Sequence, residues 1–253
     1  MTQHPLSLSA VVPAFNEEAR LPDTLRKATA YLSGTAWDWE VRVVDDGSTD
    51  GTRRIVEEFG RMDPRVILQA EPHRGKGGAV KAALLQARGS YRFICDADLS
   101  MPIDELARFL PPNLTNVDVA IGSREGTGAM RVDEPHFRHL AGRAFNIAVR
   151  QLIVPGIQDT QCGFKMFTAA AVDAIFPYVT VDGWAFDIEA LYIARLRGLT
   201  IREVPIEWHY RPESRVRMLR DGVGMFAELL RIRARAGRGA YRMRLDGRPG
   251  PAA

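Results

Sequence analysis

The fold is decided by the stretch RFICDADLS, residues 92–100, where an apolar run that favours a β-strand ends in two aspartates one residue apart. Alternate side chains of an extended segment point the same way, so Asp96 and Asp98 are predicted to aim two carboxylates at one point beyond the strand. Ligands of α/β sheets bind at this edge, and two carboxylates there suit Mg²⁺ or Mn²⁺ that also holds phosphate groups. Such a pair is equally typical of turns and helix caps, so the rest of the chain must decide its meaning.

Segments typical of strands and of helices alternate along the first half of the chain. Strands are expected at residues 6–12, 37–44, 66–69, 91–95 and 117–121, and helices at residues 21–32, 52–61, 75–88 and 102–110. This alternation predicts an α/β fold with one mainly parallel sheet, flanked by helices and joined by right-handed crossovers.

Three of the expected strands end in loops that carry acidic or amide groups. These loops follow Val12, Val44 and Cys95. The carboxyl ends of parallel strands lie at the same edge of a sheet, so we expect one crevice lined by all three loops.

The second half of the chain is less regular. Residues 122–136 are rich in glycine and charge and longer than a connection needs, so we expect a mobile loop over the site. A polar turn at residues 159–165 leads into a strand, and residues 201–209 are expected to form a late strand. Helices are expected at residues 137–154, 169–176 and 182–197.

The basic residues gather at the end of the chain. The 253 residues are 46% hydrophobic and 26% charged, as in ordinary globular proteins, with a formal net charge of +3. Residues 211–248 hold 11 arginines against 4 acidic residues, a net +7, so the rest of the chain carries −4. We expect residues 211–253 to form a basic amphipathic helix, near residues 216–236, and a disordered tail, after one domain over residues 1–210.

The basic helix has two interpretations. It lies on anionic lipid, or it packs on the domain with its arginines in water. Aromatic residues do not interleave with the arginines as single-stranded nucleic acid would require, so we expect no nucleic-acid partner.

The expected location is cytoplasmic, with peripheral contact to the inner face of a membrane through the basic helix. No stretch approaches the roughly 18 apolar residues of a spanning helix, and the first residues show no signal pattern. Cys95 and Cys162 are therefore expected to be free thiols in a reducing compartment.

Six motifs in this order resemble the family 2 glycosyltransferases, in particular the dolichyl-phosphate (polyprenyl-phosphate) glucosyltransferase branch. They are VVPAFNEE (residues 11–18), VDDGSTDG (44–51), GKGGAV (75–80), DAD (96–98), GSR (122–124) and DTQCGFK (159–165). The resemblance spans about residues 7–210 and implies that this part is the catalytic domain, a nucleotide-sugar-binding, Rossmann-like domain of the GT-A type.

The resemblance implies donor contacts from residues of these motifs: Pro13, Ala14, Glu17, Asp45, Asp46, Lys76, Asp96, Ala97, Asp98 and Arg124. Asp96 and Asp98 would hold Mg²⁺ or Mn²⁺, and Lys76 would approach the diphosphate, although a solvated lysine at a helix start is the other interpretation. The implied donor is UDP-glucose first and GDP-mannose second, and the implied acceptor is a polyprenyl phosphate. Gly77 and Gly78 would permit a close backbone approach.

The implied reaction is a single displacement that inverts the anomeric centre of a hexose. Asp159 is the first candidate for the catalytic carboxylate. Asp187 is the second, with a carboxylate that merely favours a helix N-terminus as the other interpretation. Arginines on and beside the long loop are candidates for gripping an acceptor phosphate: Arg124, Arg131 and Arg138.

Three other functions stay open at this stage. The first is a transferase of the same family with a polysaccharide or a soluble phosphorylated acceptor. The second is a sugar-phosphate nucleotidyltransferase, which would carry a glycine-rich basic segment where residues 13–18 read PAFNEE. The third is a non-catalytic nucleotide-binding module, in which several acids at one mouth would repel one another without a cation.

Overall fold

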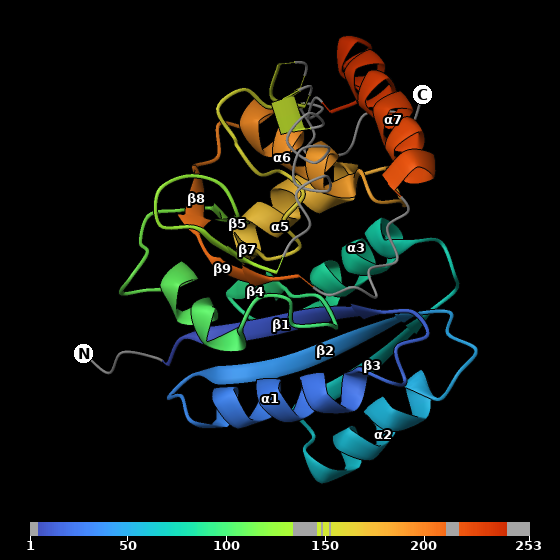
Figure 1. Cartoon of the computed structure of the whole chain (residues 1–253), viewed down its shortest axis with the longest axis vertical. Coiled ribbons are helices and arrows are strands. Elements are labelled where there is room, and N and C mark those ends of the chain that lie inside the picture. Colours follow the sequence, from blue (N-terminus) through green and yellow to red (C-terminus); the bar gives the residue numbers. More distant parts are fainter. Residues whose placement is uncertain (1–4, 134–145, 148, 152, 211–217, 242–253) are drawn as a thin grey trace.

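A seven-stranded sheet forms the centre of the described part of the chain (Figure 1). The structure is a computed structural model, and it describes residues 5–133, 146–147, 149–151, 153–210 and 218–241. The strands of the sheet are β1 (Ser7–Ala14), β2 (Asp38–Asp46), β3 (Val66–Glu71), β4 (Tyr91–Ile94), β5 (Val119–Ser123), β7 (Lys165–Thr168) and β8 (Ile201–Pro205). Their order is β3-β2-β1-β4-β7-β5-β8, and only β7 runs antiparallel to its neighbours. The predicted α/β fold with a mainly parallel sheet is confirmed.

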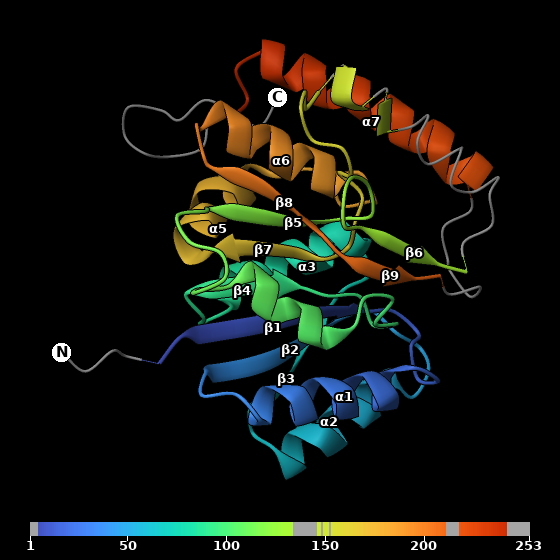
Figure 2. The same ribbon diagram turned by 60° about the vertical axis from the view of Figure 1, so that its left-hand side comes forward.

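Helices cover both faces of the sheet (Figures 1 and 2). One face carries α1 (Leu21–Ser33), α2 (Thr52–Met62) and the 3₁₀ helix η1 (Ile103–Phe109). The other carries α3 (Lys76–Gln86), α5 (Ala169–Ile175), the 3₁₀ helix η2 (Phe176–Tyr178), α6 (Phe186–Leu196) and α7 (Met218–Gly237).

The central strands are apolar throughout because both of their faces are buried. In β1, Leu8, Ala10 and Val12 pack in the core beneath α1, while Val11 packs in the core beneath α3. Near-continuous apolar runs are typical of strands buried on both sides. They also explain why these segments could be identified as strands from the sequence.

The connections bring three strand ends together. The chain passes from β1 to β2 and β3, and then returns through α3 to β4 on the other side of β1. The order of the strands reverses here, which is where open α/β sheets bind ligands. The expected crevice after β1, β2 and β4 is therefore present.

Two predictions for the second half were wrong in detail. Residues 122–136 were expected to be a loop, but residues 122–123 end β5 and residues 130–132 form β6 (Met130–Val132), while residues 134–136 lie outside the described residues. Strand β6 pairs in parallel with β9 (Glu207–His209) as a second sheet. The late strand expected at residues 201–209 is divided between β8 and β9 at Ile206. The amide of Ile206 donates a hydrogen bond to the carbonyl of Ser123, and its carbonyl accepts one from the amide of Met130. These pairings join distant segments, so the local pattern did not reveal them.

The expected helices differ less from the structure. Residues 102–110 form the 3₁₀ helix η1 in place of a regular helix, and α6 begins at Phe186 because residues 182–185 form a loop. Most of the helix expected at residues 137–154 lies outside the described residues, as does Arg138.

The C-terminal helix α7 packs on the domain along one side. Leu229 and Ile232 are fully buried in the core that α3, α5 and α6 share, whereas Phe226 and Leu230 are 44% and 55% exposed. Within the described residues, no helix has both the length and the apolar character that crossing a membrane requires.

Candidate functional site

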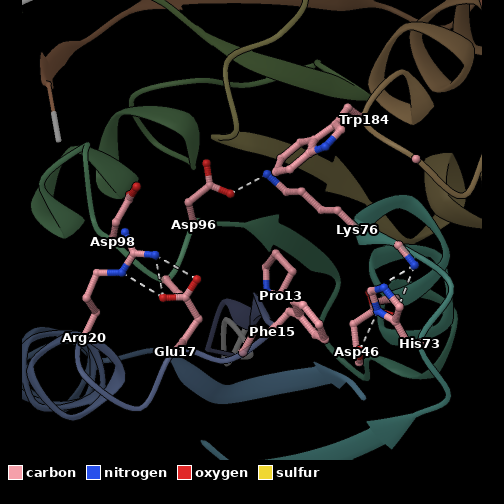
Figure 3. A pocket seen from close by; sticks show the side chains of 15 residues that line it. Pro13, Phe15, Glu17, Arg20, Asp46, His73, Lys76, Asp96, Asp98 and Trp184 are labelled. Atoms are coloured by element: carbon pink, nitrogen blue, oxygen red, sulfur yellow. Dashed lines mark hydrogen bonds and ion pairs between the residues drawn. The ribbon is translucent and has the colours of Figure 1, made fainter. Parts of the chain in front are cut away.

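A cavity of about 380 Å³ lies at the carboxyl edge of β1, β2 and β4 (Figure 3). Its lining comes from the loops after these strands, the start of α3 and the loop before α6. The lining residues are Pro13, Ala14, Phe15, Glu17, Arg20, Asp46, His73, Gly75, Lys76, Ala79, Asp96, Ala97, Asp98, Gly183 and Trp184.

Most of the residues predicted to contact a donor meet in this cavity. They are Pro13, Ala14, Glu17, Asp46, Lys76, Asp96, Ala97 and Asp98. Asp46 ends β2 and Asp98 follows β4, yet both line the same cavity, as expected from the three loops. Asp45 is fully buried outside the lining, where its carboxylate accepts hydrogen bonds from the Arg53 side chain at 2.5 Å and the amide of Ser48.

Asp46 organises the loop that carries Lys76. Its carboxylate accepts hydrogen bonds from the amides of Arg74 and Gly75, at 2.9 Å and 3.0 Å, and lies 2.9 Å from His73 Nδ1. The ring of His73 in turn stacks on Phe15, with centroids 4.4 Å apart and planes inclined by 19°. A carboxylate at the end of β2 thus fixes both an aromatic pair and the start of α3.

Glu17 is held by an arginine that the sequence analysis did not single out. Arg20 donates to both oxygens of Glu17, at 2.8 Å and 2.9 Å, and lines the cavity beside Asp98 (Figure 3). The spacing of three residues at a helix start could have revealed this pair. His73 and Trp184 come from remote loops, and no local pattern pointed to either.

Lys76 extends across the cavity toward the first acid of the DAD motif. Its Nζ lies 2.5 Å from Asp96 Oδ1 and 5.4 Å from the centre of the Trp184 ring. The two aspartates have different partners, because Asp98 accepts a hydrogen bond from the amide of Ser100 at 2.9 Å.

The glycines of GKGGAV serve a contact within the protein. The amides of Gly77 and Gly78 donate to the carbonyl of Asp182, at 2.7 Å and 3.2 Å. A Cβ on Gly77 would lie 2.6 Å from both the Val181 carbonyl oxygen and Phe186 Cβ. The close approach expected at these positions is therefore made by the loop before α6.

A cluster of buried charges adjoins the cavity. Asp159 is fully buried and accepts hydrogen bonds from Arg124 at both oxygens, at 2.7 Å and 2.8 Å. Lys165, also fully buried, bonds the carbonyl of Cys162 and lies 3.2 Å from Asp187 Oδ1. None of Arg124, Asp159 and Asp187 is among the residues that line the cavity.

The two buried carboxyls of this cluster titrate in opposite directions. Burial alone would raise the pKa of Asp159, but the charge and hydrogen bonds of Arg124 outweigh it and lower the pKa to about 2. Burial raises the pKa of Asp187, and the nearby ammonium groups of Lys165 and Lys76 offset the increase only in part. Asp159 is therefore a weak base, whereas Asp187 binds a proton more readily.

The comparison with known families agrees with this geometry. Residues 9–176 match the family described as Glycosyl transferase family 2, which is more than half of the chain. The chain belongs to this family. The nucleotidyltransferase and the non-catalytic module are thereby set aside.

Curated relatives of this family 2 glycosyltransferase cover most of its length. The dolichyl-phosphate beta-glucosyltransferase of Dictyostelium discoideum is 34% identical, over 90% of this chain and 74% of the relative. The human protein of the same name is 35% identical, over 93% of this chain and 78% of the relative.

Solved structures share the fold of this family 2 glycosyltransferase at lower identity. Glucosyl-3-phosphoglycerate synthase of Mycobacterium tuberculosis, solved with UDP, matches with a TM-score of 0.67 and 20% identity, over 92% of this chain and 80% of the other. A second structure of that enzyme holds Mn²⁺, UDP-glucose and phosphoglyceric acid, with a TM-score of 0.66.

In this family 2 site, two carboxylates fit a divalent cation whose remaining ligands come from a bound phosphate and water. Within the described residues, no group of three or more His, Cys, Asp or Glu side chains is arranged to hold a metal by itself. Asp96 and Asp98 nevertheless line the cavity together. Mg²⁺ is typically held by one or two carboxylates with phosphate oxygens and water, so this pair fits.

Proposed function

We propose that the chain is an inverting glucosyltransferase that moves glucose from UDP-glucose to a polyprenyl phosphate of the dolichyl-phosphate type. The observation that carries the proposal is a cavity in which Lys76, Asp96 and Asp98 meet, in a chain 34–35% identical to dolichyl-phosphate beta-glucosyltransferases over at least nine-tenths of its length. In the reaction, the bond from the anomeric carbon to the UDP oxygen breaks and UDP leaves with the electron pair. A phosphate oxygen of the lipid forms the new bond from the opposite face.

The nucleoside occupies the half of the cavity near β1 and β2 in this proposal. The stacked Phe15 and His73 offer an aromatic surface, and Pro13 and Ala14 line the cavity as well. Stacking on aromatic rings suits a flat base. Glu17, paired with Arg20, offers an acceptor to ribose hydroxyls or a base N–H group.

The diphosphate lies between Lys76 and the DAD motif. A divalent cation, Mg²⁺ or Mn²⁺, held by Asp98 with Asp96 would stabilise the charge that develops on the leaving diphosphate. The Mn²⁺ and UDP-glucose bound in the glucosyl-3-phosphoglycerate synthase support this assignment. Lys76 adds a positive charge of its own from the start of α3.

The acceptor requires positive charge more than it requires a base. A lipid phosphate is already an anion near neutral pH, so no proton has to leave before it attacks. We assign Asp159, the first candidate for the catalytic carboxylate, to positioning: its two oxygens fix the guanidinium of Arg124 beside the acceptor path. Asp187, the second candidate, has the higher proton affinity and is the better choice for a hydroxyl acceptor.

Helix α7 is assigned to contact with the membrane that holds the lipid. Phe226 and Leu230 are exposed four residues apart and share one side of the helix. Exposed arginines, Arg231 and Arg233, follow them. Apolar side chains with arginines beside them suit an anionic lipid surface, and Leu229 and Ile232 keep the helix attached to the domain.

Transfer of labelled glucose tests the proposal. The full chain is incubated with UDP-glucose, Mn²⁺ and dolichyl phosphate in detergent, and the product is extracted into organic solvent. We expect an acid-labile β-linked glucolipid with UDP-glucose and little product with GDP-mannose. Asp98→Asn should reduce the rate at least about a hundredfold, the usual scale for loss of transition-state electrostatics. A product formed only with 3-phosphoglycerate would overturn the lipid acceptor, and no transfer from any nucleotide sugar would overturn the function.

A further inference from the structure

We propose that Trp184 is the platform on which the hexose of the donor lies, so that the loop before α6 forms the sugar subsite. The inference rests on the proposed function and adds to it a contact with the transferred group. It follows from the exposure of the ring, the anchoring of its loop and its place relative to Lys76.

Trp184 is partly exposed and lines the cavity although its loop is firmly held. The residue is 36% exposed and lines the cavity, whereas Trp39 in β2 is 2% exposed. On one side of the loop, the carbonyl of Asp182 accepts hydrogen bonds from the amides of Gly77 and Gly78. On the other, the buried Glu189 accepts the amides of Thr180 and Val181, at 2.7 Å and 2.8 Å. Leaving so large an apolar ring in water is unfavourable, so an exposed ring on an anchored loop indicates a ligand that covers it.

The ring lies on the other side of Lys76 from the aromatic pair proposed to hold the base. Lys76 reaches across the cavity between Trp184 on one side and the Phe15–His73 stack on the other (Figure 3). The glycosyl carbon of a nucleotide sugar is joined directly to the second phosphate. If the base covers Phe15 and Lys76 holds the diphosphate, the hexose extends to Trp184. Asp187, in the first turn of α6, then lies three residues further along the chain.

An indole ring suits both the hexose and its reaction. Each face of a pyranose presents C–H groups, which carry partial positive charge and pack on the negative face of an aromatic ring. In glycosyl transfer the anomeric carbon gains positive charge in an oxocarbenium-like transition state, and an aromatic face attracts positive charge. The ammonium of Lys76, 5.4 Å from the ring centre, already occupies such a position relative to Trp184.

Calorimetric titration of two ligands isolates the sugar contact. UDP and UDP-glucose are titrated with Mn²⁺ into the wild type, Trp184→Leu, Trp184→Phe and the control Trp37→Phe, whose ring packs near Tyr31 away from the cavity. We expect the Kd for UDP to stay within about twofold in all four proteins. The Kd for UDP-glucose should rise about tenfold in Trp184→Leu and less in Trp184→Phe, which keeps an aromatic face.

Tryptophan fluorescence gives a second reading that does not depend on affinity. UDP-glucose at saturation should change the emission of the wild type and of Trp37→Phe more than UDP does, and this difference should vanish in Trp184→Phe. Equal Kd values for UDP-glucose in Trp184→Leu and the wild type, or an emission difference that survives in Trp184→Phe, would overturn the platform. Failure of UDP to bind the wild type would instead overturn the proposed function, and the platform with it.

Discussion

At the scale of single residues, Asp159 and Asp187 show how one buried cluster gives two carboxyls different chemistry. Arg124 bonds both oxygens of Asp159, and this outweighs burial, so the carboxylate stays ionised. Burial raises the pKa of Asp187, and the ammonium groups of Lys165, 3.2 Å from its Oδ1, and of Lys76 offset this increase only in part. Groups whose environments separate their pKa values in this way are typical of sites with distinct structural and acid–base roles.

Asp159→Asn tests the structural side of this difference. The substitution leaves Arg124 without its carboxylate partner. We therefore expect the free energy of unfolding near neutral pH to fall by about 3 kcal/mol, at the low end of the range for breaking a buried ion pair. Asp159 has its pKa lowered from 3.8 to about 2, so its contribution is present above pH 3.8 and disappears as the pH falls toward 2.

The difference in unfolding free energy between the wild type and Asp159→Asn should therefore shrink across that pH window. Urea titrations at several pH values measure it. A variant that is as stable as the wild type near neutral pH, or a difference that grows on acidification, would contradict the assigned ion pair. Near-normal glucosyl transfer by a stable Asp159→Asn would remove this carboxylate from the mechanism.

At the scale of elements, the start of α3 and the loop before α6 form one unit. Gly77 lacks a side chain at the point where Val181 and Phe186 approach, and its amide bonds Asp182. Lys76 on one segment and Trp184 on the other are thereby held in a fixed relation. The shape of the cavity depends on this contact between segments more than a hundred residues apart.

Gly77→Ala should separate the two segments. Alanine normally stabilises a helix by about 1 kcal/mol relative to glycine. Here its Cβ would meet two atoms at 2.6 Å, so we expect a net loss of about 2 kcal/mol from overpacking and weaker UDP binding. Gly183→Ala, whose Cβ would meet nothing within 4 Å, is the matched control and should change stability by less than about 0.5 kcal/mol. Urea unfolding and UDP titration measure the stability and the UDP affinity of both variants. A Gly77→Ala variant more stable than the wild type would disprove the close contact between α3 and the loop before α6.

The elements that the sequence predicted are those set by local pattern. The runs that became β1, β2 and β4 and the acids that follow them were identifiable, because strands buried on both faces are apolar and ligands bind at their ends. The partners of those acids were not identifiable. The pairing of Asp96 with Lys76 and the packing of the loop before α6 on Gly77 depend on contacts between segments far apart in the sequence. The pairing of β6 with β9 was missed for the same reason.

At the scale of the whole molecule, α7 and the residues that follow it are connected to the loop before α6 through the buried Glu189 and through Thr180. Glu189 in α6 accepts hydrogen bonds from Thr180 and Val181 before the Trp184 loop and from the hydroxyl of Tyr241 at 2.7 Å. The guanidinium of Arg235 in α7 donates a hydrogen bond to the hydroxyl of Thr180 at 2.6 Å. Helix α7 lies beside α6 (Figure 2), and the C-terminal segment therefore supports the loop that lines the cavity. Deleting it would disturb the site, so its contact with membranes has to be tested by substitution.

The two sides of α7 allow that substitution. Leu229 and Ile232 belong to the core, whereas Phe226 and Leu230 face away from it. Replacing both exposed residues, Phe226→Ser with Leu230→Ser, should leave the fold and transfer to a detergent-solubilised acceptor intact. We expect it to abolish sedimentation with vesicles that contain anionic phospholipid, because about 25 cal/mol per Å² of apolar burial is lost.

The matched control is Met62→Ser, which removes a 72% exposed apolar side chain from α2, at the far end of the molecule (Figure 1). It should sediment as the wild type does. The wild type should also release from the vesicles as salt is raised, because the arginines beside the apolar pair contribute screened attraction. Equal sedimentation of the double variant and the wild type would show that α7 only packs on the domain. Absence of wild-type binding to any vesicle would point to an acceptor delivered to the site without membrane contact by this helix.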